Sequence, residues 1–538
     1  VTFLSTRRKG SQHSRSITTL VSEFHFRTVH NISKTFEEFI LTHSFKMWSS
    51  SAFLLFLSVT MMGGSPSFAF TASVGASSSS MATRRQPSAI RVATKAAMDT
   101  PETLPDFANV EEYMEYMETV SQLPKGFATG SADGTFVSVE APSLGNLKIR
   151  ATVIHMTEGP TDSWAACFTS NKFPGAPIKV GRKRMAEGGP LQALVINNKV
   201  SNVCSGGDGE ADAELVCSAV AKGLGLESSS LVLPSSTGVI GWRLPAKELA
   251  EDVVPVAVKN LQSDSVLSAA SAIMTTDRFP KVRSKTLSNG ARVVGIAKGA
   301  GMIEPNMATM LSYILTDATI PKDKLQSMLS SVVDETFNCL SIDGDESTSD
   351  TVVCVASNQV SEDVDMGEFE TALMQVCKGL AADIVRNGEG TSHVMRVSIS
   401  NFPGTKRQAR FLGRHIVNSP LFKCAVSGND PNTGRLAGAI GSYMGKYMPD
   451  SDLSKMSLTL GGRCIFSEGK FVLEGDTVEK ELSDHMASAE YGDSTDFPPH
   501  QRFVEIGVDF GDLDGTSLSV LGSDLTKEYV VINADYRS

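Results

Sequence analysis

The sequence predicts a mixed α/β fold in which many neighbouring strands pair in antiparallel fashion. From about Leu123 onward, short β-type runs alternate with segments whose apolar residues recur at helical spacing. Asn289-Gly290, which lies between two such runs, is a turn typical of a β-hairpin. With 538 residues, of which 41% are hydrophobic and 20% charged, the chain is long enough for two or three domains with their own cores.

The expected elements follow in order along this region. A helix is predicted over 210–226, where Gly223 or Gly225 can end it. A second helix is predicted over 321–340, with Pro321 in the first turn, where its missing N–H does no harm. A hairpin is predicted at 285–299, and strands at 146–156, 192–197, 351–357, 394–400, 502–510 and 528–536.

The composition argues against several classes of function. A net charge of −11 and a pI of about 5.4 make a uniformly attractive surface for nucleic acid or an acidic membrane unexpected. No run reaches the roughly 18 apolar residues of a membrane-spanning helix. No glycine-rich phosphate loop stands between a strand and a helix, so no nucleotide cofactor is expected.

The cysteines do not form a metal-binding pattern. They are scattered, contain no Cys-x-x-Cys pair and have no His at ligand spacing, so no metal is expected. Their apolar surroundings indicate small buried hydrophobic residues in a reducing compartment. The eight are Cys167, Cys204, Cys217, Cys339, Cys354, Cys377, Cys424 and Cys464.

Residues 1–98 are predicted to be a presequence. Met47 resembles a start, and the apolar run 51–62 that follows is typical of a signal peptide. Residues 76–98 are rich in Ser, Ala and Arg and lack acids, as in a transit peptide. This order, with Phe70 near the junction, resembles the bipartite presequence of algae with secondary plastids. It favours the plastid stroma; a mitochondrial presequence, or a tail with no targeting role, is the alternative.

One threonine stands immediately before a strongly apolar run. If the bond between Ala308 and Thr309 is cut, the new α-amine lies beside the Thr309 hydroxyl and can act as its base. Gly299, Gly301 and Pro305 allow the tight backbone path that such a cut needs. A buried threonine at the start of a strand is the plain alternative.

A second turn offers hydrogen-bond donors. In "SSTGVIG", residues 235–241, Thr237 and Gly238 can aim a hydroxyl and a backbone N–H at one point. Donors arranged in this way stabilise a tetrahedral oxyanion. Taken alone, the turn is more simply explained as an ordinary loop capped by a threonine.

Seven motifs in order resemble the ornithine acetyltransferase family, also called glutamate N-acetyltransferase or ArgJ. The resemblance extends from about Leu123 to Ser538, and seven ordered motifs are far more specific than any one of them. They are "SSTGVIG", "IMTTDRFPK", "AKGAGMIEPNMATML", "SIDGDESTSDT", "RNGEGTSHVMRV", "SPLFKCAVSGNDPNTGRLAGAIG" and "VINADYRS".

The resemblance implies a layered α-β-β-α sandwich of the ArgJ/DmpA type with a smaller C-terminal α/β lobe. It also implies cleavage between Ala308 and Thr309, giving an α chain, 99–308, and a β chain, 309–538, which assemble as an α2β2 heterotetramer. Thr309 then carries acetyl from N²-acetyl-L-ornithine to L-glutamate in a ping-pong reaction of arginine biosynthesis. No prosthetic cofactor is implied, although some members of the family also use acetyl-CoA as a donor.

The same resemblance assigns substrate contacts. Lys298 suits a carboxylate, Glu389 an ammonium and Thr275 a further polar group, and Asn533 and Ser538 match two more contact positions. Taken alone, Lys298 is interpreted as a solvated turn lysine, Glu389 as a loop residue after a helix, and Thr275 as a helix N-cap.

The chain departs from the family pattern at residues 196–207, at Thr433, where tryptophan is usual, and at Ser538, where threonine is usual. These changes put substrate affinity and the use of acetyl-CoA in doubt more than cleavage. Two other functions remain: an amidase or aminopeptidase that transfers to water, and a non-catalytic plastid binding protein.

Overall fold

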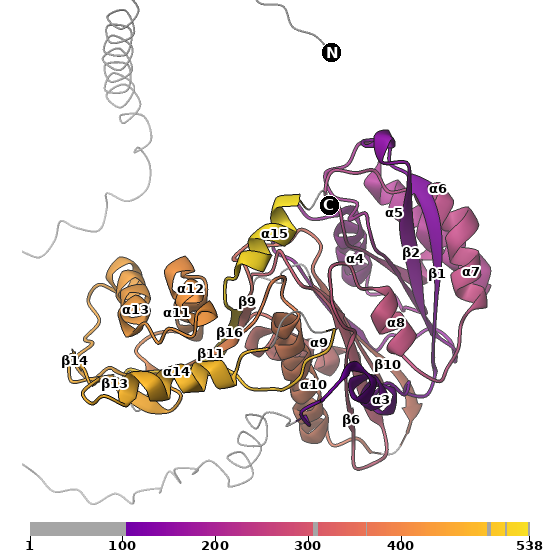
Figure 1. Ribbon diagram of the computed structural model, residues 1–538. Coiled ribbons are helices and arrows are strands. Elements are labelled where there is room, and N and C mark those ends of the chain that lie inside the picture. The colour runs from indigo at the N-terminus through magenta and orange to yellow at the C-terminus, as the bar shows by residue number, and fades with distance from the viewer. Residues whose placement is uncertain (1–103, 305–309, 362, 492–495, 512–513, 536–538) are drawn as a thin grey trace, which may run out of the picture. The chain divides into compact units, whose positions relative to one another are not determined.

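The computed structural model describes residues 104–535 apart from 305–309, 362, 492–495 and 512–513 (Figure 1). All of these residues lie within the compact unit Arg85–Ser538. The predicted presequence, the cleavage site Ala308–Thr309 and Ser538 lie outside the described residues. Among the described residues, no helix combines the length and apolar character needed to cross a bilayer.

Two sheets pack face to face. One apolar cluster joins Phe127 and Ile154 of the first sheet to Tyr313 and Val353 of the second. In the first sheet the order is β1 (Phe127–Val137), β2 (Asn146–Met156), β4 (Ala193–Asn197), β5 (Val232–Ser236). In the second it is β3 (Trp164–Phe168), β10 (Thr351–Val360), β8 (Leu311–Ala318), β7 (Arg292–Lys298), β6 (Lys281–Thr286).

Helices cover the outer face of each sheet. Successive residues of a strand point to opposite faces, so Ile314 lies in a different cluster from Tyr313, together with Leu329 of α9 (Lys322–Glu335) and Leu380 of α10 (Met366–Arg386). The first sheet is covered by α5 (Gly209–Leu224), α6 (Ala246–Glu248), the π-helical turn η3 (Leu249–Val253) and α7 (Val254–Lys259). The resulting α-β-β-α sandwich is the predicted fold (Figure 1).

Among the described residues, five further elements complete the sandwich. They are α3 (Val110–Val120), η1 (Pro142–Leu144), α4 (Ala176–Glu187), η2 (Ser229–Leu231) and α8 (Leu267–Ala272).

The C-terminal part forms an α/β lobe around a third sheet. Its strand order is β14 (Lys470–Phe471), β13 (Arg463–Ser467), β12 (Ser457–Leu460), β15 (Val504–Asp509), β11 (Val394–Phe402), β16 (Thr516–Ser523), β9 (Leu340–Ser341). Its helices are α11 (Lys406–Val417), α12 (Pro420–Ser427), α13 (Thr433–Tyr447), α14 (Val478–Ser488) and α15 (Lys527–Asp535). Because β9 directly follows α9 in the chain, its pairing with β16 ties the lobe to the sandwich.

Local signals set several boundaries as predicted. Helix α5 ends at Gly225, whose φ of 70° lies in the left-handed region that glycine tolerates. The hairpin of β6 and β7 turns around Asn289-Gly290. Pro321 is the residue before α9 and not part of its first turn. The strand that follows Thr309 in the chain, β8, is buried along its whole length at the centre of the second sheet.

The strand predicted at 528–536 is wrong, because Lys527–Asp535 is the helix α15. The β-branched run at Val530 and Val531 suggested a strand, but both side chains are 60% exposed and gain little from a sheet. Thr526 Oγ1 instead accepts hydrogen bonds from the N–H groups of Glu528 at 3.2 Å and Tyr529 at 3.4 Å. A cap of this kind favours a helix start over an extended chain.

The cysteine prediction is correct only in part. Four cysteines are buried, one is partly buried, and Cys204, Cys424 and Cys464 are exposed, so the apolar neighbours in sequence did not decide burial. Burial raises the pKa of the Cys217 thiol to about 12, which makes it a poor nucleophile.

Candidate active site

The predicted oxyanion turn follows β5. Thr237 is 1% exposed, and its N–H donates to Asn197 O at 3.0 Å. Gly238 has a φ of 126°, and a Cβ there would lie 2.2 Å from the carbonyl carbon of Lys199. Both the conformation and the space therefore require glycine. Thr237 is buried and the backbone geometry of the turn is fixed, so the alternative of an ordinary loop is wrong.

Lys298, at the end of β7, points at this turn. Its Nζ donates to Thr237 Oγ1 at 3.2 Å, and the side chain is 2% exposed. The alternative of a solvated turn lysine is therefore wrong. An ammonium group only donates hydrogen bonds, so Thr237 Oγ1 accepts from Lys298 and its own proton is left to point elsewhere. Burial lowers the pKa of Lys298, although the charge of Asp277 opposes the shift.

Asp277 organises the backbone around Lys298. Its Oδ1 accepts from Lys281 Nζ at 2.5 Å and from Gly299 N at 2.7 Å, and its Oδ2 accepts from Thr275 N at 2.9 Å. Burial by itself would raise the pKa of Asp277, but Lys281, Lys298 and the Gly299 N–H outweigh it and lower the pKa. The sequence argument missed Asp277 and Lys281, although both lie in the "IMTTDRFPK" motif. Thr275 is exposed beside them.

Glu389 joins the same region from the loop after α10. Its N–H donates to Ala300 O at 2.8 Å, and its carboxylate lies against Gly301, where a Cβ would approach Oε2 to 2.5 Å. Asn533, on α15, donates from Nδ2 to Glu389 Oε2 at 2.9 Å. The predicted substrate contacts Glu389 and Asn533 therefore meet, although Asn533 is on a helix and not on the predicted strand.

The described residues that flank Thr309 lie close to this constellation. Leu311 is paired with Lys298 across β8 and β7, and Met310 N donates to Asp350 Oδ1 at 2.9 Å. Asp350 is fully buried, and this burial raises its pKa well above the usual range, although the Met310 N–H opposes the shift. The sequence argument missed Asp350.

The arrangement brings hydrogen-bond donors that suit an oxyanion, the Lys298 ammonium and the Glu389 carboxylate close to the start of β8, the strand that follows Thr309 in the chain. Such a set suits acyl transfer between molecules with an α-amino-acid end. In the part of the chain that the structure describes, no group of three or more His, Cys, Asp or Glu side chains is arranged to hold a metal ion.

The family model and the relatives found by comparison with known proteins point to the same family. A model of the ArgJ family matches residues 144–538. The arginine biosynthesis bifunctional protein ArgJ 2 of Clostridium acetobutylicum is 36% identical over 381 residues, which cover 70% of this chain and 90% of that protein. A protein of the same name from Nostoc is 35% identical over 421 residues, which cover 78% of this chain and 99% of that protein.

Solved structures are similar over part of the chain. Arginine biosynthesis bifunctional protein ArgJ from Bacillus halodurans is 30% identical with a TM-score of 0.36, and the match covers 42% of this chain and 100% of the solved chain. The ornithine acetyltransferase of Mycobacterium tuberculosis, solved with ornithine, is 32% identical with a TM-score of 0.29. The match covers 35% of this chain and 95% of the solved chain.

Proposed function

This chain belongs to the ArgJ family of arginine-biosynthesis proteins, and on that premise we propose that it transfers acetyl from N²-acetyl-L-ornithine to L-glutamate. The observation that carries the proposal is the hydrogen bond from Lys298 to Thr237, because it joins the oxyanion turn to the strand beside β8. We propose Thr309 as the nucleophile and the cut between Ala308 and Thr309 as the step that makes it.

In the processing step, Thr309 Oγ attacks the carbonyl carbon of Ala308, its proton passes to the amide nitrogen, and the C–N bond breaks to leave an ester on Oγ and a free α-amine on Thr309. Water then hydrolyses the ester, which restores the Thr309 hydroxyl and leaves Ala308 with a free carboxylate. The glycines at 299 and 301 support this proposal because they let the chain turn sharply before the cut. The same amine is the base in the later reaction, since its ordinary pKa of about 8 leaves much of it unprotonated at neutral pH.

In the first half-reaction, the amine takes the Thr309 hydroxyl proton as Oγ attacks the acetyl carbonyl of N²-acetylornithine. Thr237 O–H and Gly238 N–H would donate to the oxyanion, and Lys298 supports that role because its own donation to Thr237 Oγ1 leaves the hydroxyl proton free for the oxyanion. The C–N bond breaks, the nitrogen takes the proton, and ornithine leaves acetyl on Thr309.

In the second half-reaction, the glutamate amine attacks the acetyl ester through an oxyanion at the same place. The C–O bond breaks, Thr309 Oγ regains its proton, and N-acetylglutamate leaves. Glu389 with Asn533 would hold the α-ammonium of ornithine or, in its turn, that of glutamate. Lys298, Thr275 and Ser538 would hold the remaining polar groups of the substrate. One pocket then serves donor and acceptor in turn, and acetyl-CoA is a second donor to assay.

Intact-mass spectrometry of residues 99–538 under denaturing conditions tests the nucleophile. We expect two chains, one beginning at Thr309, and a single uncut chain from the Thr309→Ala variant. Ornithine release from N²-acetylornithine is then measured with and without glutamate. Release that depends on glutamate supports transfer, whereas equal release without glutamate would indicate a hydrolase. An uncut wild-type chain with no activity would indicate a binding protein.

We extend the proposal to assembly as α2β2 and to import into the plastid stroma, with the mitochondrial matrix as the alternative. The support is the family resemblance and the signal-then-transit order of residues 47–98. Light scattering of the cleaved protein measures the assembly, and a fluorescent protein fused to residues 47–98 reports the destination in an algal cell. A monomer, or a fusion left in the cytosol, would contradict these two points.

A further inference from the structure

A single loop, residues 342–350 between β9 and β10, holds the chain on both sides of the proposed cut. Before the cut, Ile342 N donates to Ile303 O at 2.8 Å. After the cut, Met310 N donates to Asp350 Oδ1 at 2.9 Å. Ile303 and Met310 are 0% and 1% exposed, so both anchoring points are buried. The proposed cut lies between these two points in the chain.

Asp343, in the same loop, binds two successive backbone N–H groups. Its Oδ2 accepts from Met302 N at 2.7 Å, and its Oδ1 accepts from Ile303 N at 2.8 Å. The same Oδ1 also accepts from Asp345 N at 3.2 Å. Successive N–H groups that point at one anion form the arrangement called a nest. Both carboxylate oxygens are used, and an amide side chain, which has only one oxygen, cannot replace them.

The backbone at Met302 has a conformation that needs this support. Its φ of 55° lies in the left-handed region, which residues with a side chain rarely adopt. Such a conformation costs free energy and persists only where the surroundings impose it. The Met302 side chain is 41% exposed. The hydrogen bonds to Asp343, and not burial of the side chain, therefore account for the conformation.

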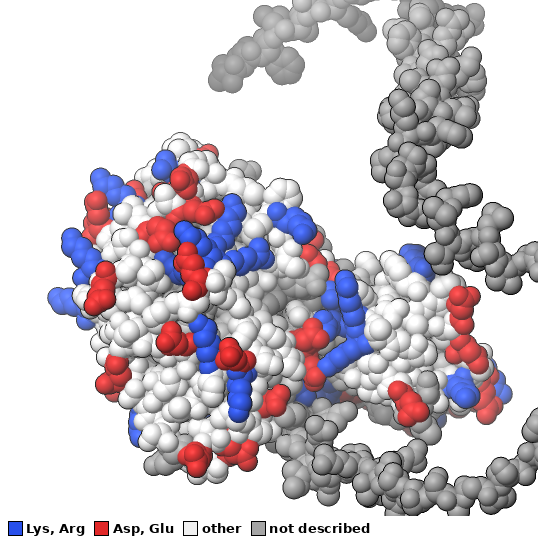
Figure 2. All heavy atoms as spheres, turned by 180° about the vertical axis from the view of Figure 1, so that it is seen from behind, with Lys and Arg blue, Asp and Glu red and all other residues white. Residues whose placement is uncertain are grey.

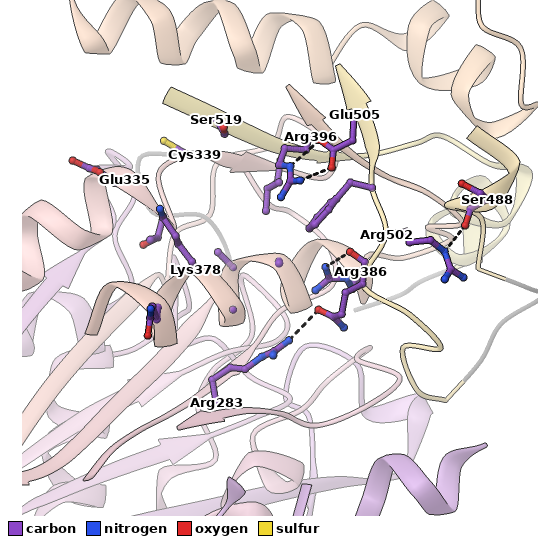
Figure 3. A pocket seen from close by; sticks show the side chains of 18 of the residues that line it. Arg283, Glu335, Cys339, Lys378, Arg386, Arg396, Ser488, Arg502, Glu505 and Ser519 are labelled. Atoms are coloured by element: carbon purple, nitrogen blue, oxygen red, sulfur yellow. Dashed lines mark hydrogen bonds and ion pairs between the residues drawn. The ribbon is translucent and has the colours of Figure 1, made fainter. Parts of the chain in front are cut away.

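These contacts are separate from two more conspicuous features of the molecule. Figure 2 shows Lys and Arg side chains interspersed with Asp and Glu on one face, where exposed ion pairs do little to hold a backbone in place. A cavity of about 450 Å³, lined by Cys339 and Ser519 among others, lies between α10 and the strands of the lobe (Figure 3). Neither Asp343 nor Met302 lines it.

We propose that Asp343 is a positioning residue for the cleavage before Thr309, and the inference rests on that proposed cleavage. Asp343 holds Met302 and Ile303 from one end of the loop, while the other end holds Met310. Together these contacts limit the conformations open to the chain around the cut. With fewer competing conformations, the Thr309 hydroxyl reaches the carbonyl carbon that it attacks more often.

The rate of self-cleavage tests the proposal. The full chain is synthesised in a cell-free extract, translation is stopped, and the conversion of the precursor into two chains is followed over time on a denaturing gel. We expect Asp343→Asn to be cut about tenfold more slowly than the wild type or slower still, because one hydrogen bond to a charged group is lost. Asp343→Glu keeps two carboxylate oxygens and should be cut at an intermediate rate.

Asp317, near the opposite end of β8, provides the matched control. Its Oδ2 accepts from Lys125 N at 3.0 Å and its Oδ1 from Arg292 N at 2.7 Å, so this carboxylate also binds two backbone N–H groups. Asp317→Asn should lower the stability toward urea about as much as Asp343→Asn, when both are measured in the uncut Thr309→Ala background. We nevertheless expect Asp317→Asn to be cut at the wild-type rate.

The proposal is overturned if Asp343→Asn is cut as fast as the wild type, or if Asp343→Glu is cut as slowly as Asp343→Asn. It is also overturned if Asp317→Asn slows the cut to the same extent, because the effect would then follow from lost stability and not from position. A wild-type chain that stays whole would overturn the proposed cleavage together with this inference. A cut wild type with no effect of Asp343→Asn overturns the inference alone.

Discussion

Replacing Lys298 by methionine tests how the oxyanion turn is activated. Methionine keeps the apolar stem of lysine and removes the ammonium that donates to Thr237 Oγ1 at 3.2 Å. A hydrogen bond to a charged group contributes about 1.5–3 kcal/mol. Since about 1.4 kcal/mol corresponds to a factor of ten in rate, we expect kcat/KM for ornithine release to fall about 10- to 150-fold.

Stability should change much less than activity. Asp277 keeps Lys281 and the N–H groups of Gly299 and Thr275 as partners when Lys298 is replaced. Burial lowers the pKa of Lys298, which means that the charged form is costly in the folded protein. We therefore expect the free energy of unfolding, measured in urea, to change by about 1 kcal/mol or less.

A double-mutant cycle with Thr237→Val decides how Lys298 acts. The assay is ornithine release at saturating glutamate, after mass spectrometry has verified the cut before Thr309 in each variant. Thr237→Val alone should cost about 100- to 1000-fold. If Lys298 works through the Thr237 hydroxyl, the double variant is no slower than Thr237→Val. Wild-type activity of Lys298→Met would refute this reasoning altogether. Losses that simply multiply would also refute it, and would leave Lys298 as a substrate contact only.

Three further results are expected. Gly238→Ala should lose at least about 100-fold in activity, because its Cβ would meet the Lys199 backbone; normal turnover would contradict the turn's role. Asp277→Asn should destabilise the fold by about 3–5 kcal/mol in urea, since it leaves the buried ammonium of Lys281 without its counter-ion, and adding Lys281→Met should recover part of the loss. Burial lowers the pKa of Lys423 from about 10.5 to about 8, so the unfolded state holds more protons between pH 8 and 10.5; the stability of the wild type relative to Lys423→Met should therefore rise through that window by up to about 1.4 kcal/mol per pH unit, and a flat difference would contradict it.

Much of the sandwich was predictable because its signals are local. The hairpin around Asn289-Gly290 and the end of α5 at Gly225 depend on backbone conformations that few residues adopt. The apolar run of β8 is a local signal of another kind. A strand with eight successive buried residues needs protein on both faces, and such a strand is apolar throughout. The sequence also placed Thr237 and Gly238 in one turn.

By itself, then, the sequence determined the fold class, most elements and the family motifs, because periodicity and turn chemistry act over a few residues. Only the tertiary structure decided that Lys298 is buried against Thr237, that Asp277 is held by Lys281, and that the chain end containing Asn533 is a helix docked on Glu389. These outcomes depend on groups brought together from distant strands and loops. Burial and charge pairing across such distances override local propensity, and no short stretch of sequence records them.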